Sequence, residues 1–245
     1  MKITVWNEFR HEKENDDIRA LYPNGMHACI ADFLKKAGNE VTLAALDDPE
    51  CGLSENILNE TDVLFWWGHL HHMDVPDEIV QKVYERVMNG MGLVCLHSAH
   101  NSKIFKKLVG TNAGKLKWRE SDDREILWNV APGHPITRGI GDRIDIEHEE
   151  TYGEHFMIPT PDELIFISWF SGGEVFRSGC VFNRGLGKIF YFRPGHEAVP
   201  TYYHPDVQRV LINAAEYVCP KKLEKNLTYG HIQRSLDTTD NFIPF

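Results

Sequence analysis

The sequence predicts an α/β fold in which a mostly parallel, open sheet has helices on both faces. The first observation is that short apolar runs alternate with amphipathic segments of helical length over residues 3–109. This alternation is typical of parallel strands joined by right-handed helical crossovers. The second is that shorter strand-like runs follow one another with only turns between them over residues 126–182. They predict an antiparallel excursion in the middle of the chain.

In the amino-terminal part, strands are expected at residues 3–6, 40–46, 62–68 and 92–96. Residues 28–37 have helical spacing and stop at Gly38, a common helix C-terminal signal. Residues 76–89 form a second predicted helix, which begins with a proline in its first turn and ends at Gly90. A short third helix is predicted at residues 102–109.

The rest of the chain continues the pattern. The antiparallel strands are predicted at residues 126–130, 143–146, 164–170 and 174–182. A strand at 188–192 returns to the main sheet, and a helix at 207–217 closes it. We predict one domain over residues 1–220 and a peripheral C-terminal tail over residues 221–245.

Composition limits the classes of partner and cofactor. The formal charge of −10 argues against a nucleic-acid partner, because phosphate binding needs clustered Lys and Arg. The chain enters its first strand without a charged and apolar leader, and its apolar runs are too short to span a membrane, so we expect a cytoplasmic protein with no membrane partner. The five cysteines are scattered without a CxxC pair, which excludes a disulfide framework. No GxGxxG follows the first strand, so we expect no nucleotide cofactor.

The most informative stretch is residues 92–100, GLVCLHSAH, where an apolar run ends abruptly at His97. The small residues after it favour a sharp turn of the nucleophile-elbow kind, with His97 above the edge of the sheet. Residues 188–197 have the same character and deliver His196 and Glu197. Cys95 lies inside the first of these strands, so we expect a buried and inert thiol.

Most of the remaining histidines also fall just past predicted strand ends, where ligands bind in open parallel sheets. The polar residues expected at this edge are Asn7, Glu8, Arg10, His11, His69, His71, His72, His97, Ser98, His100, Arg193, His196 and Glu197. A further polar cluster, residues 147–155, follows the strand at 143–146. A single loop histidine is often merely solvated, and we assign His11, His27, His204 and His231 to that class and His134 to a turn. Trp66 and Trp67 suit the core and its rim, although a Trp at a strand end can stack on a sugar.

Several segments, taken together and in order, resemble the ThuA family of trehalose-utilisation proteins. They are residues 62–69, 92–100, 133–136, 149–154 and 193–197, with the sequences DVLFWWGH, GLVCLHSAH, GHPI, EETYGE and RPGHE. The resemblance covers nearly the whole chain. It implies a flavodoxin-like, class I glutamine amidotransferase-like fold and a role in the use of trehalose or other disaccharides.

The same resemblance implies a difference in chemistry from true class I amidotransferases. Those enzymes carry a catalytic cysteine at the elbow and a His and a Glu at a later strand end. Here the elbow holds His97, and His196 and Glu197 stand roughly where the later pair would be. An imidazole cannot form the thioester that glutamine hydrolysis requires, so we expect no glutaminase activity.

Three functions remain open. The first is a metal-assisted enzyme that holds a divalent cation, zinc by preference, through His69, His97, His148 and His196. The second is a metal-free enzyme acting on a sugar derivative such as a 3-keto glycoside, with acid–base chemistry by His97, Glu150, His196 and Glu197. The third is a non-catalytic sugar-binding or regulatory subunit.

In each case the resemblance implies that the ligand is a carbohydrate. The residues expected to bind it are Asn7, Glu8, Trp67, His100, Tyr152, Glu154 and Tyr202. The density of titratable groups favours an isomerase, lyase or hydrolase over a binding module. Aromatic residues around Tyr202 and Tyr203 are consistent with a homo-oligomer.

Overall fold

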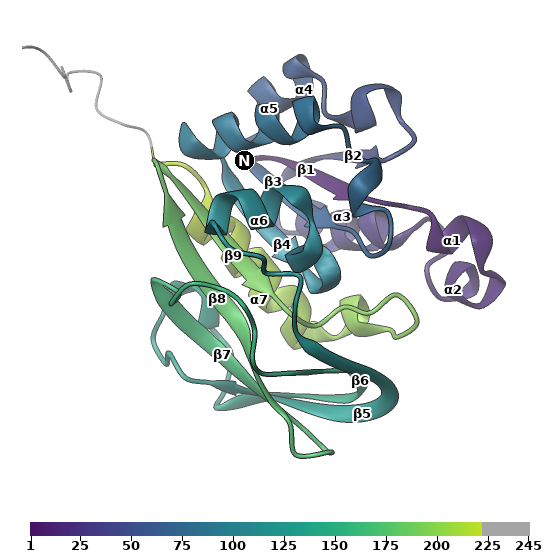
Figure 1. Cartoon of the computed structure of the whole chain (residues 1–245), viewed down its shortest axis with the longest axis vertical. Coiled ribbons are helices and arrows are strands. Elements are labelled where there is room, and N and C mark those ends of the chain that lie inside the picture. The colour runs from purple at the N-terminus through teal and green to yellow at the C-terminus, as the bar shows by residue number, and fades with distance from the viewer. Residues whose placement is uncertain (222–245) are drawn as a thin grey trace, which may run out of the picture.

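The computed structural model describes residues 1–221 and confirms the α/β class (Figure 1). One nine-stranded sheet has the order β2-β1-β3-β4-β9-β8-β7-β5-β6. Most of the predicted tail, and His231 with it, lies outside the described residues. Within them, no helix is long and apolar enough to cross a membrane.

One half of the sheet is parallel, as the sequence predicts. Its strands are β1 (Lys2–Asn7), β2 (Glu40–Ala45), β3 (Val63–Trp67), β4 (Gly92–Leu96) and β9 (Gly187–Phe192). Every residue of β3 and β4 is buried. These two strands read as continuous apolar runs because helices cover both of their faces.

The expectation of a mostly parallel sheet is wrong, because the other half of the sheet is antiparallel and contains the longest strands. This half consists of β5 (Lys117–Asn129), β6 (Arg143–Gly153), β7 (Glu163–Phe170) and β8 (Val175–Arg184). The predicted strand at 126–130 therefore matches only the end of β5, and the one at 143–146 matches only the start of β6. The start of β5 is polar and exposed, so pairing with β6 holds it rather than burial of an apolar face.

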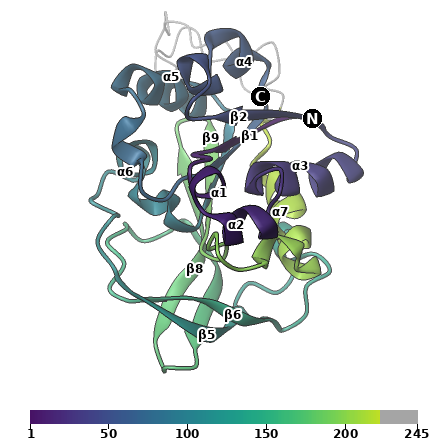
Figure 2. The same cartoon turned by 90° about the vertical axis from the view of Figure 1, so that its right-hand side faces the viewer.

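Helices cover the two faces of the parallel half, as expected (Figure 2). On one face lie α4 (Glu55–Glu60), α5 (Asp77–Met88) and α6 (Lys103–Val109), and on the other lie α3 (Met26–Lys36) and α7 (Pro205–Val218). Two short helices, α1 (His11–Glu14) and α2 (Asp16–Leu21), follow β1 and are absent from the sequence prediction. His11 is the first residue of α1, and its ring stacks on that of His69 at the carboxyl end of the sheet.

Candidate functional site

The site lies where the carboxyl ends of β3, β4 and β9 meet. β1 lies between β2 and β3, so the strand order reverses direction beside β1. Open α/β sheets bind ligands at the carboxyl ends of the strands near such a reversal. His69 follows β3, His97 follows β4 and His196 follows β9. The ring centroids of His97 and His196 are 5.4 Å apart, and those of His69 and His196 are 5.8 Å apart. These three histidines therefore follow strand ends, as the sequence predicts.

His97 occupies the predicted elbow in a backbone conformation that few side chains adopt. Its φ is +50° between β4 and the short 3₁₀ helix His97–Asn101, and its side chain is fully buried. Positive φ is uncommon outside glycine, and such strained residues cluster at functional sites. Cys95 lies inside β4 as expected, and burial raises the pKa of its thiol far above the usual range.

Two contacts define the chemistry of the His97 ring. Nδ1 lies 3.0 Å from the carbonyl oxygen of Arg193, which can only accept, so Nδ1 carries a proton. In the neutral ring Nε2 is therefore bare, and it lies 3.1 Å from Oε2 of Glu150. Burial acts to raise the pKa of Glu150, but the protonated form of His97, in which Nε2 donates to this carboxylate, and the other positive charges nearby outweigh burial and lower it.

His196 has the opposite tautomer. Its Nδ1 accepts a hydrogen bond from the backbone N–H of Ala198 at 3.2 Å, so the proton of the neutral ring is on Nε2. Burial lowers the pKa of His196, and the neighbouring His97 lowers it further, which favours the neutral ring. The site thus presents one imidazole as a proton acceptor and another as a proton donor.

A buried ion network behind the two rings holds them in place. The guanidinium of Arg193 pairs with Glu125 and lies 3.4 Å from Glu149, and all three side chains are fully buried. Glu149 in turn accepts the backbone N–H groups of Gly195 and His196 at 2.9 and 3.2 Å. One arginine therefore supplies the carbonyl that orients His97 and the charge that anchors the carboxylate under His196.

Sequence reasoning missed the role of this network. The sequence feature that could have revealed the network is the presence of charged residues inside strands that are otherwise apolar. Such residues are buried only when they are paired. Arg193 and Glu149 lie within segments already singled out, whereas Glu125 precedes the predicted strand at 126–130.

A second cluster lies beside the first. Oε1 of Glu197 is 2.8 Å from Nδ1 of His69 and 3.6 Å from Nε2 of His11, whose ring stacks on that of His69. Burial opposes ionisation of Glu197, but the His69 contact outweighs it and lowers the pKa of Glu197 to about 2. His11 was expected to be a solvated loop residue, and that expectation is wrong, because at the start of α1 it packs against His69 and Glu197.

Beside these clusters lies a cavity of about 420 Å³, a size typical of small-molecule sites, which is lined by Glu150 of the first cluster and by the whole of the second, whereas the rings of His97 and His196 lie behind its wall. One wall is polar and includes His11, His69, His100, Glu150 and Glu197. Leu70, Leu116 and Trp118 supply apolar surface, and Tyr152 also lines the cavity.

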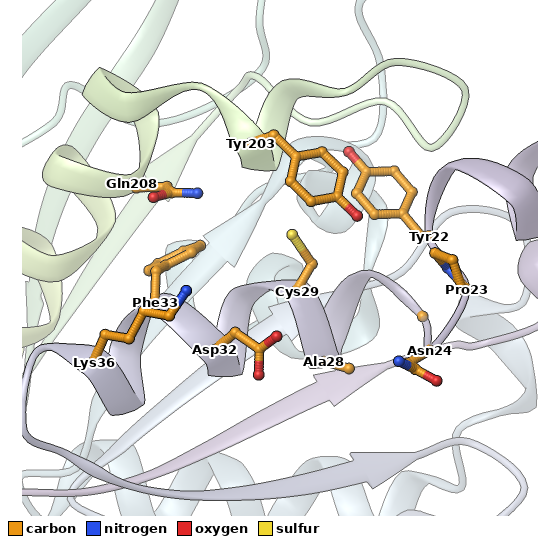
Figure 3. Close-up of a pocket in the computed structure, with 11 residues that line it drawn as sticks. Tyr22, Pro23, Asn24, Ala28, Cys29, Asp32, Phe33, Lys36, Tyr203 and Gln208 are labelled. Carbon is orange, nitrogen blue, oxygen red and sulfur yellow. The ribbon is translucent and has the colours of Figure 1, made fainter.

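A separate hollow of about 160 Å³ lies between α3 and the 3₁₀ helix Thr201–Tyr203 (Figure 3). It is lined by Tyr22, Cys29, Asp32 and Tyr203 among others. Burial raises the pKa of the Cys29 thiol to about 11, so the thiolate is scarce at neutral pH. This hollow offers no acid–base pair comparable to that of the main cavity.

Two residues predicted for the site lie elsewhere. His148 is on β6 with about half of its side chain exposed, and its Nδ1 is 3.1 Å from Oδ2 of Asp122. It points away because residues 147–153 continue β6, in which His148 and Glu149 lie on opposite faces. Glu154 is also misplaced: it pairs with Arg177 at 2.8 Å and does not line the cavity.

Other predicted binding residues support the site from within the core. The Asn7 amide donates to Glu12, and Glu8 accepts the backbone N–H groups of His69 and His71, so both residues shape loops. Trp67 donates from its indole to the carbonyl of Gly195, and Tyr202 packs beneath the same glycine. Both aromatic side chains are fully buried, so neither can stack on a ligand in this structure.

His100 and Tyr152 do reach the cavity, as expected. Nδ1 of His100 donates to the carbonyl of Ala113 at 3.1 Å. The Tyr152 ring stacks on His97 with centroids 5.3 Å apart, and its hydroxyl bonds the Ser98 hydroxyl at 2.9 Å. Tyr152 thus packs directly against the elbow.

Two sets of side chains could hold a cation. The donor atoms of His97, Glu150 and His196 lie within 4.8 Å of one another, and so do those of His11, His69 and Glu197. In the described part of the chain, His97 Nε2, Glu150 Oε2 and His196 Nε2 are buried without a hydrogen-bond partner, which is uncommon for polar atoms. The first set therefore suits either an ion or a polar ligand.

Three histidines are buried and uncharged, so stability should fall in mild acid; one of them is His27, which was expected to be solvated, and that expectation is wrong. Burial lowers the pKa of His27 and His72 to about 4 and that of His100 to about 3. The unfolded chain takes up protons near pH 6.5, so between about pH 6.5 and 4 it binds more protons than the folded chain and unfolding becomes easier.

Each of these histidines should lower the free energy of unfolding by up to about 1.4 kcal/mol per pH unit in that range. Urea unfolding between pH 7.5 and 5 measures the slope. The variant His27→Gln should have a shallower slope than the natural protein. An equal slope would show that His27 is protonated in the folded state.

Comparison with known proteins agrees with this architecture. A family model for trehalose utilisation, ThuA, matches residues 2–218. Similar solved structures include ThuA-like proteins from Parabacteroides merdae (15% identity, TM-score 0.65, 92% of this chain and 93% of that one) and Bacteroides uniformis (16%, 0.61, 89% and 91%). A glutamine amidotransferase from Thermotoga maritima is similar at 12% identity and a TM-score of 0.56, over 89% of this chain and 97% of that one.

At these identities the solved structures establish the fold alone. No curated protein matches the chain. The family model, by contrast, spans almost all of the described residues and covers every strand of the sheet. The chain therefore belongs to the ThuA family of trehalose-utilisation proteins.

Proposed function

We propose that this protein is an enzyme that acts on a sugar derivative, such as a 3-keto glycoside, by acid–base chemistry. The observation that carries the proposal is the pair of neighbouring imidazoles with opposite tautomers, in which the neutral His97 ring has a bare Nε2 and the neutral His196 ring has an Nε2–H, beside Glu150 of the cavity wall. The sugar class is supported by the description of the family as one of trehalose utilisation.

The chemistry follows from the acidity of a C–H bond beside a carbonyl group. His97 Nε2 takes the proton from that carbon, and the C–H electron pair forms a C=C bond as the carbonyl oxygen accepts the proton of His196 Nε2. Glu150 is placed to stabilise the positive charge on His97. The resulting enediol can return its proton to the neighbouring carbon, which is isomerisation, or expel a substituent, which is elimination.

Solvent exchange tests the proposal without knowledge of the final product. In D₂O, 3-keto-trehalose should exchange the hydrogens beside its carbonyl faster with the protein than without it, as followed by proton NMR. Binding of the sugar without accelerated exchange would overturn the enzymatic proposal and support a sugar-binding or regulatory subunit. Failure to bind this sugar and other keto-sugars would overturn the substrate class.

A metal-assisted form is the second candidate, and the unpartnered atoms of His97, Glu150 and His196 favour it. His97 fits a metal ligand well, because a histidine that binds a metal commonly donates its other N–H to a carbonyl. His196 fits less well, because its Nε2 would first have to lose a proton. A divalent cation bound there would polarise the carbonyl group of the substrate.

Metal content measured by plasma mass spectrometry on protein purified without a histidine tag decides between the two forms. The metal-assisted form predicts near-stoichiometric zinc or another divalent metal that is lost in His97→Ala and retained in His148→Ala, the matched control on β6. No uptake after incubation with several divalent ions would leave the metal-free form.

A further inference from the structure

Trp118 is exposed to an unusual degree for a residue beside a buried polar site. Its relative exposure is 64%, whereas Trp6, Trp66 and Trp67 are at most 1% exposed. It lines the cavity together with Leu116 and with Leu70, which is itself 68% exposed. Large apolar side chains gathered at the opening of a pocket mark a ligand-binding surface more often than chance exposure does.

The strand register connects Trp118 to the acid–base pair. Trp118 on β5 lies directly opposite Tyr152 on β6, so their side chains leave the same face of the sheet with Cβ atoms about 5 Å apart. Tyr152 in turn stacks on His97. One wall therefore runs from the elbow through Tyr152 to Trp118 at the opening.

We infer that Trp118 is the stacking platform for the second ring of the disaccharide that the family description implies. This inference rests on the proposed function. A pyranose ring has an apolar face of C–H groups and a rim of hydroxyls. The indole of Trp118 suits the C–H face, while Asn101 and Glu120, which also line the cavity, are placed to bond hydroxyls.

The reacting ring then lies at the inner end, near Glu150 and Glu197, and the second ring lies against Trp118. Trp67 was expected to bind the sugar, but it fills the core. In the described residues, Trp128 and Trp169 are partly exposed too, but neither lines this cavity.

An indole titration tests the inference. Trehalose is added to ¹⁵N-labelled protein, and the tryptophan side-chain N–H signals are followed, with Trp118 assigned through Trp118→Phe. The Trp118 signal should shift with trehalose and much less with glucose, while the signals of Trp128 and Trp169 stay in place. A response of the Asn101 amide without one from Trp118 would overturn the platform and leave the proposed function standing.

Affinity gives the matched control. Trp118→Ala should weaken trehalose binding about tenfold and leave glucose binding within about twofold, whereas Trp169→Ala should change neither. Equal trehalose affinity in the natural protein and Trp118→Ala would overturn the inference. If neither trehalose nor its 3-keto derivative perturbs any residue of the cavity, the platform and the sugar class fail together.

Discussion

Replacing His97 with asparagine should lower the rate of proton exchange on a 3-keto glycoside by about 10²–10⁴-fold while the fold is kept. Asparagine tolerates the positive φ of this position, and its amide N–H₂ can take over the bond to the Arg193 carbonyl. What it lacks is the bare Nε2 beside Glu150. The substitution therefore removes the proposed base and spares the elbow.

The measurement is the NMR exchange rate in D₂O at saturating sugar, with urea unfolding of the same variant as the check on folding. His148→Asn makes the same chemical change on the exposed face of β6 and should leave the rate unchanged. Natural exchange rates in a folded His97→Asn protein would show that another group abstracts the proton.

Replacing Arg193 with methionine should lower the free energy of unfolding by about 3–5 kcal/mol at pH 7. The change leaves Glu125 and Glu149 fully buried without their cation. Water cannot solvate them there, and the loss of one partner from a buried ion network is much more costly than the loss of an exposed pair.

Arg138→Met provides the comparison, because Arg138 pairs with Glu216 on the surface, where both side chains are about half or more exposed. Its loss should cost less than about 1 kcal/mol. Urea midpoints and slopes for both variants give the two free energies. Similar small losses would show that Glu125 and Glu149 become protonated or reach solvent when Arg193 is absent.

The same arginine should also affect the site, because its backbone carbonyl orients His97 and its guanidinium holds the carboxylate that binds the His196 backbone. This coupling was invisible in the sequence. Arg193 reads as one more polar residue after a strand, and only the packing shows that its charge faces inward.

Local patterns in the sequence predicted the strands of the parallel half, its longer helices and the elbow well, but missed the short helices α1, α2 and α4. Residues 92–96 had to be a buried strand because an apolar run of that length, followed by small residues, suits few other structures. The same reasoning placed His97, His196 and Glu197 beyond strand ends. It failed for the start of β5 and the end of β6, where polar residues form strands by pairing with each other.

The sequence by itself therefore determined the α/β class, the family and the strand-end positions of the candidate catalytic residues, since each depends on patterns within a short segment. Only the tertiary structure decided that His11 joins the site, that His148 leaves it, and that Trp118 rather than Trp67 faces the cavity. Those outcomes depend on strand register and on how α1 packs against the loop that follows β3. Register and chain path are set by contacts between residues far apart in the sequence, which local periodicity does not encode.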